Sequence, residues 1–136
     1  MTSAYATALT QDLLTGGRKV DPTCPVRGFC YTLSEALYWL CYRTAGYRPH
    51  VGRVPGGGTH WWLQDRAGHI VDATSAQFDA ETLVSIYSVG RACGFLTGAP
   101  SKRARQLMAR IEQQQGGADG NVLGLGRRDH YHDFTF

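Results

Sequence analysis

The chain of 136 residues has no apolar run approaching the roughly 20 residues that a membrane-spanning helix needs. It also has no basic segment followed by an apolar stretch at residues 1–5, so the sequence predicts no secretory signal. These absences favour a cytoplasmic protein whose thiols stay reduced and which makes no contact with a membrane.

The four cysteines do not form a zinc-binding pattern, because no two of them have the spacing Cys-x-x-Cys. Nothing in their context requires a disulfide. Near the C-terminus, Asp129 and Asp133 flank His130 and His132, and the two histidines would share one face of a strand. A histidine pair at the end of a chain is more often incidental than a ligand set, so neither a metal nor a cofactor is predicted.

Basic residues are concentrated between positions 101 and 128, although the formal net charge of the chain is only +3. This range holds two acidic residues and six basic ones, which are Lys102, Arg103, Arg105, Arg110, Arg127 and Arg128. The excess fits a solvated helix face, or a face that binds an acidic protein or a nucleic acid. Lys102, Arg103 and Arg105 are the residues predicted to contact such a partner.

Apolar residues recur at helical spacing in three segments, residues 3–15, 31–45 and 101–114. The second is the clearest, since Thr32 and Glu35 have the spacing of a capping box and Gly46 follows as a stop. Ser101 is predicted to cap the last of the three helices. Residues 77–88 read as a short helix or a mixed segment.

Three shorter runs are predicted to be strands, residues 49–54, 59–64 and 68–73, and aromatic and β-branched residues fill the second and third. The last two are joined by a turn at 65–68, and glycine-rich residues 55–58 precede the second. The predicted fold class is therefore α+β, with helices packed on a small antiparallel sheet. Residues 1–136 form a single domain, in which 118–136 are a glycine-rich tail.

Cys30, His60 and Asp72 are the residues whose types and positions suggest chemistry. Cys30 directly precedes the clearest helix, where the helix dipole favours a thiolate. His60 opens one strand, and Asp72 ends the next strand twelve residues later, so a hairpin would place them side by side. Thiol, imidazole and carboxylate are the nucleophile, base and orienting group of a cysteine triad. The plainer interpretations are a buried thiol, a histidine at a strand edge and a turn-capping carboxylate.

The segment from Gly28 to Phe78 resembles the core of the transglutaminase-like/papain-like thiol superfamily. The matching residues, in order, are Gly28-Phe29-Cys30, Ala36, Leu40, Gly46-Tyr47-Arg48-Pro49, His60-Trp61 and Asp72-Ala73-Thr74. The resemblance implies a papain-like/transglutaminase-like core with Cys30 as nucleophile, His60 as base and Asp72 as orienting group. It also implies acyl transfer at an amide or thioester, without separating peptidase, amidohydrolase and transglutaminase outcomes.

The residues predicted to bind the substrate, a peptide or protein amide, are Trp61, Trp62 and Gln77. The two tryptophans alternate across the strand, so one belongs to the core and the other lines a groove. Gln11, Gln77 and the backbone N–H of Cys30 are candidates for stabilising the oxyanion. The alternative function is a non-catalytic module of the same fold, which binds an acidic protein or nucleic acid through the basic C-terminal helix.

Overall fold

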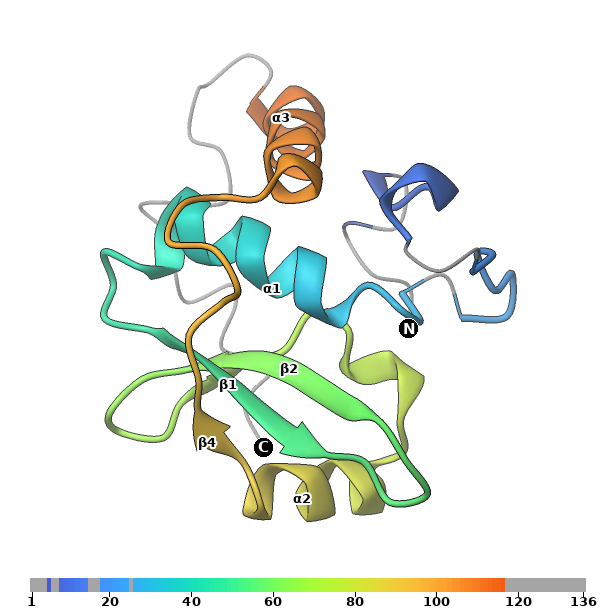
Figure 1. Cartoon of the computed structure of the whole chain (residues 1–136), viewed down its shortest axis with the longest axis vertical. Helices are drawn as coiled ribbons and strands as arrows, with labels where there is room; N and C mark the ends of the chain where they lie inside the picture. Colours follow the sequence, from blue (N-terminus) through green and yellow to red (C-terminus); the bar gives the residue numbers. More distant parts are fainter. Residues whose placement is uncertain (1–4, 6–7, 15–17, 25, 117–136) are drawn as a thin grey trace.

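A four-stranded antiparallel sheet lies between helices in the computed structural model, which describes residues 5, 8–14, 18–24 and 26–116 (Figure 1). The elements in chain order are η2 (Gln11–Leu13), α1 (Cys30–Leu37), η3 (Tyr38–Tyr42), β1 (Arg48–Arg53), β2 (Thr59–Gln64), β3 (Ile70–Val71), η4 (Ser75–Gln77), α2 (Ala80–Ser88), β4 (Arg91–Ala92) and α3 (Lys102–Gly116). Helix α1 lies on one side of the sheet with α3 beyond it, and α2 lies on the other side. The predicted α+β class is confirmed. No helix in the described part of the chain is long and apolar enough to cross a membrane.

The strands are arranged in the order β3-β2-β1-β4, with every neighbouring pair antiparallel. The predicted strands at 49–54 and 59–64 are confirmed as β1 and β2, which pair along their whole length. The predicted strand at 68–73 is reduced to Ile70–Val71, because residues on both sides of it form turns. Gly68 has φ +90° in the turn before β3, and Asp72 accepts a hydrogen bond from the backbone of Thr74 after it.

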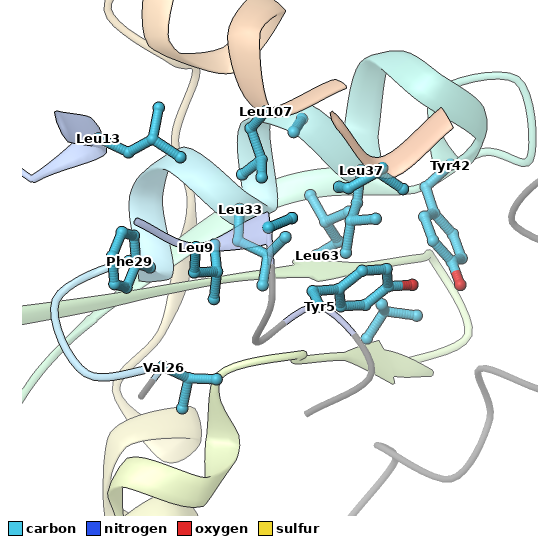
Figure 2. Close-up of a cluster of buried hydrophobic side chains, with 14 of the residues drawn as sticks. Tyr5, Leu9, Leu13, Val26, Phe29, Leu33, Leu37, Tyr42, Leu63 and Leu107 are labelled. Atoms are coloured by element: carbon cyan, nitrogen blue, oxygen red, sulfur yellow. The ribbon is translucent and has the colours of Figure 1, made fainter. Parts of the chain in front are cut away.

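The core between α1 and the sheet collects side chains from several parts of the chain (Figure 2). Leu33 and Leu37 of α1 meet Leu107 of α3 and Leu63 of β2 there, all at most 1% exposed. The N-terminal segment closes this core with three residues at helical spacing, Tyr5, Leu9 and Leu13. The helix predicted at 3–15 is nevertheless wrong for the described residues, which form short turns such as η2 and no α-helix. The predicted face is buried, but tertiary packing rather than a helix brings it there.

The capping box predicted at Thr32 and Glu35 is also wrong. Helix α1 begins at Cys30, after Phe29, and no side chain caps it. Glu35 is fully buried and accepts hydrogen bonds from both the backbone N–H and the hydroxyl of Ser101, each at 2.8 Å. Ser101 in turn caps α3 by accepting from the N–H of Ala104 at 3.2 Å, as predicted. Glu35 therefore joins α1 to α3 instead of capping its own helix.

The core on the other side of the sheet is centred on Trp62, which packs with Ile70 and with Ile86 of α2. The indole has no exposed surface, and its N–H donates to Oε1 of Gln64 at 2.9 Å. Its ring lies directly against the backbone of Gly90, where an added Cβ would be 2.4 Å from Cζ2 of Trp62. A side chain at position 90 therefore cannot coexist with this position of the indole.

We expect Gly90→Ala to lower the free energy of unfolding by about 1–3 kcal/mol, because the added methyl group overpacks the Trp62 core. Urea unfolding followed by intrinsic fluorescence measures the effect. Gly94→Ala is the matched control, since a Cβ there meets no atom within 4 Å. Equal losses in the two variants would contradict the packing argument.

Candidate active site

Three elements bring the predicted triad residues to one place. Cys30 is the first residue of α1, His60 is the second residue of β2, and Asp72 directly follows β3. The β2-β3 hairpin places His60 beside Asp72 as predicted, with 2.6 Å between Nε2 of His60 and Oδ2 of Asp72. The side chains of His60 and Asp72 are 0% and 1% exposed, whereas Cys30 is half-buried.

The carboxylate of Asp72 is buried but has hydrogen-bond donors on both oxygens. Oδ2 accepts from Nε2 of His60 and from the hydroxyl of Tyr87, each at 2.6 Å. Oδ1 accepts from the backbone N–H and the hydroxyl of Thr74, at 3.2 and 3.3 Å. These four donors offset the cost of removing a carboxylate from water.

The imidazole of His60 is held between two aromatic rings. Trp62 stacks beside it with ring centroids 5.9 Å apart, and Phe78 meets it edge-on at 4.9 Å. An ionised carboxylate only accepts hydrogen bonds, so the nitrogen facing Asp72, Nε2, carries a proton. Nδ1 is buried and has no hydrogen-bond partner among the described residues.

The charge state of His60 is set by competing effects. Burial alone would lower its pKa, but the hydrogen bond with Asp72 and the neighbouring thiol of Cys30 outweigh burial and raise the pKa to about 9. Because Nε2 is engaged by Asp72, the nitrogen left to interact with Cys30 is Nδ1. The arrangement therefore runs from thiol to imidazole to carboxylate, and it favours an imidazolium at neutral pH.

Tyr87 of α2 is a fourth member of this arrangement that the sequence analysis missed. Its hydroxyl donates to the same carboxylate oxygen that faces His60, at 2.6 Å. Burial and the negative charge of Asp72 raise the pKa of Tyr87, so the phenol stays a protonated donor. No local pattern distinguishes Tyr87 from the other apolar residues of its helix, since its role depends on how α2 packs against the sheet.

The predicted substrate-binding residues have different surroundings. Trp61 is half-buried and stacks on Phe95 with ring centroids 5.7 Å apart, whereas Trp62 is the tryptophan of the core. The prediction of a substrate contact is therefore kept for Trp61 and withdrawn for Trp62, which has no exposed surface. Gln77 is half-buried, and its Nε2 is a buried donor without an acceptor in the described part of the chain. It directly precedes Phe78, whereas Gln11 is exposed in η2.

The predicted partner-binding residues lie at the start of α3. Lys102, Arg103 and Arg105 are exposed, and none of them forms an ion pair with another described residue. Arg110 does not belong to this free set, because its Nη2 lies 2.7 Å from Oδ2 of Asp12. The remaining basic pair, Arg127 and Arg128, lies outside the described residues, as do Asp129, His130, His132 and Asp133.

No disulfide joins any of the four cysteines, Cys24, Cys30, Cys41 and Cys93. Within the described ranges, no three histidine, cysteine or acidic side chains are grouped as a metal site would require. Comparison of the chain with protein-family models, with curated proteins and with solved structures gave no match. The geometry of Cys30, His60, Asp72 and Tyr87 is therefore the basis for assigning a function.

The raised pKa of His60 predicts that the free energy of unfolding depends on pH. Below the pKa of 6.5 that His60 has in the unfolded chain, both states bind the proton and the stabilisation is fully present. As the pH rises from there toward about 9, only the folded state keeps the proton, and the stabilisation is progressively lost. Stability should therefore fall by about 3 kcal/mol from this group between these pH values. Urea unfolding at a series of pH values measures the fall.

His60→Gln should remove this component of the pH dependence. The control is His50→Gln, which changes a half-buried histidine whose Nδ1 faces the carbonyl of Arg48 and not Asp72. If His60→Gln retains the slope of the wild type, the assigned protonation of His60 is wrong.

Proposed function

We propose that the protein is a thiol-dependent acyl-transfer enzyme, of the cysteine peptidase/amidohydrolase or transglutaminase type, that acts on a peptide or protein amide. The observation that carries the proposal is the buried His60, which binds Asp72 through Nε2 at 2.6 Å, has Nδ1 unoccupied by any other described residue, and has its pKa raised in part by the neighbouring thiol of Cys30. A structural histidine needs no second titratable partner. A general base beside a nucleophile needs two titratable partners, the nucleophile on one side of its ring and the orienting carboxylate on the other.

The reaction divides into two steps. The thiolate of Cys30 attacks the amide carbonyl carbon and forms a C–S bond, while the carbonyl oxygen takes the negative charge. Nδ1–H of His60 then gives its proton to the amide nitrogen, the C–N bond breaks and the amine leaves. In the second step His60 takes a proton from water or from an acceptor amine, which attacks the acyl carbon and releases the Cys30 thiolate.

Two donors are available for the developing oxyanion. Cys30 occupies the first turn of α1, where backbone N–H groups have no acceptor within the helix. The unpaired Nε2 of Gln77 is the side-chain candidate, because Gln77 is adjacent to the residue that packs against His60. Asp72 and Tyr87 do not touch the substrate in this scheme. They fix the orientation of the imidazole and the nitrogen that carries its proton.

The papain-like/transglutaminase-like core remains part of the proposal. It is supported by a helix that begins at the thiol, packs on an antiparallel sheet and faces a hairpin that carries His60 and Asp72. The same order of residues along the chain gave the resemblance in the sequence.

We expect iodoacetamide to alkylate Cys30 at pH 7 at least about tenfold faster than Cys24 and Cys93, because an adjacent imidazolium favours the reactive thiolate. Peptide mass spectrometry follows each thiol separately. Cys24 and Cys93 are half-buried like Cys30 and serve as internal controls in the same molecule.

His60→Ala should slow the alkylation of Cys30 and leave the other two rates unchanged. Cys30→Ala should abolish turnover of an amide substrate without changing the unfolding midpoint by more than a few degrees. Equal rates for the three thiols, or turnover by Cys30→Ala, would refute the proposed nucleophile.

The second candidate function is binding of an acidic protein or nucleic acid by the start of α3. The favouring observation is that Lys102, Arg103 and Arg105 lie at the N-terminal end of a helix whose first turn has no acidic residue. The helix dipole is positive at that end, so three unpaired cations there are unfavourable unless an anion neutralises them.

Charge reversal tests this second function. Arg103→Glu combined with Arg105→Glu should weaken binding of a single-stranded oligonucleotide at least about tenfold at low salt, and salt should weaken the wild type similarly. Fluorescence anisotropy gives the Kd. The matched control reverses the exposed pair Arg18 and Lys19. Absence of binding at low ionic strength would eliminate the nucleic-acid version.

A further inference from the structure

A groove of about 1020 Å³ lies beyond the C-terminal end of α1, at the other end of that helix from Cys30. Its walls come from η3, the start of β1, the turn after β2 and the segment that follows β4. The lining residues that bear on its chemistry are Tyr38, Trp39, Arg43, Arg48, Arg66 and Phe95. Nothing in the triad uses this groove.

The groove has an excess of positive charge. Arg43, Arg48 and Arg66 are exposed, and none has an ion-pair partner among the residues that the structure describes. The acidic residue in the lining, Asp65, is already engaged, because its two oxygens accept from the backbone N–H and from Nδ1 of His69 at 2.8 and 2.9 Å. Three guanidinium groups therefore face the groove without a carboxylate free to bind them.

The groove also offers flat aromatic surface. Tyr38, Trp39 and Phe95 are half-buried, and the guanidinium carbon of Arg43 lies 5.4 Å from the centroid of Trp39. The indole N–H of Trp39 is a buried donor with no acceptor among the described residues. Planar cations next to half-buried rings suit a ligand that carries both carboxylates and aromatic groups.

A row of aromatic rings connects this groove to the nucleophile. Tyr38 contacts Phe95 with ring centroids 5.6 Å apart, Phe95 contacts Trp61 at 5.7 Å, and Trp61 contacts Tyr31 at 4.8 Å. Tyr31 directly follows Cys30, and Trp61 directly follows His60. The rings therefore form a contact path from the groove to the residues that directly follow Cys30 and His60 in the chain.

The length of α1 gives the separation of the two sites. Trp39 comes nine positions after Cys30 along the helical segment, a rise of about 13 Å at ~1.5 Å per residue. An extended polypeptide covers that distance in about four residues at ~3.4 Å per residue.

We propose that this groove binds an acidic segment with aromatic residues in a polypeptide substrate, about four residues from the amide that Cys30 attacks. The identity of that amide rests on the proposed function, whereas binding in the groove does not. A polypeptide is favoured over a nucleic acid because Asp65 also lines the groove, and because the aromatic row leads to a thiol whose proposed reaction is at an amide.

Fluorescence anisotropy on the full chain with Cys30→Ala tests the groove without turnover. The probe is a labelled peptide of alternating glutamate and phenylalanine. Reversal of Arg48 and Arg66 to glutamate should raise the Kd at least about tenfold, as should replacing every glutamate of the peptide by glutamine. Arg53→Glu, an exposed arginine at the other end of β1, is the matched control and should change the Kd less than about twofold.

The milder pair Arg48→Gln and Arg66→Gln provides the test if the reversed variant does not fold, with an expected rise in Kd of about threefold or more. Unchanged binding in the Arg48 and Arg66 variants, or equal binding of the glutamine peptide, would overturn the assignment. Binding of an oligothymidylate in place of the peptide would also overturn it. Intact peptide binding together with an inert Cys30 would count against the proposed reaction alone.

Discussion

The hydrogen bond between His60 and Asp72, 2.6 Å long and almost without solvent contact, is the constraint on which the arrangement of the site depends. A carboxylate in this position is stable only if donors surround it. The donors come from β2, from the turn after β3 and, through Tyr87, from α2. The sheet and the helix beneath it must therefore keep their relative positions for Asp72 to stay satisfied. The same contacts fix the plane of the imidazole.

A second buried carboxylate also fixes the relative positions of two elements, on the other side of the sheet. Glu35 of α1 accepts two hydrogen bonds from Ser101, which is also the cap of α3. Because α1 begins at Cys30, the contact that joins α1 to α3 lies little more than one turn from the thiol. The elements that carry the predicted triad residues are thus each tied to a helix by a buried acid: the hairpin to α2 by Asp72, and α1 to α3 by Glu35. The position of the sulfur relative to the imidazole depends on both ties.

Local patterns in the sequence predicted the parts of the fold that local forces determine. Alternating side chains and a glycine turn were sufficient for β1 and β2, and a serine cap with an apolar stripe was sufficient for α3. The hairpin also predicted that His60 and Asp72 are neighbours. Tyr87, the use of Glu35 for another helix, and the two-residue strand β4 were not predictable, because each depends on contacts between segments distant in the sequence. Spacing alone could not show that the N-terminal residues pack without a long helix.

Burial of His60 has two opposite consequences for its chemistry. Removal from water disfavours the imidazolium and would leave a neutral ring if no charge were near. The same low-dielectric surroundings strengthen the interactions of the imidazole with Asp72 and with the thiol of Cys30, and these two interactions raise the pKa of His60 above its ordinary value. The aromatic rings of Trp62 and Phe78 exclude water from the imidazole but supply no charge. The core thus strengthens the interaction of the imidazole with its neighbours. Asp72 and the thiol of Cys30 make the net shift of the His60 pKa upward, so that the ring beside the sulfur holds a proton.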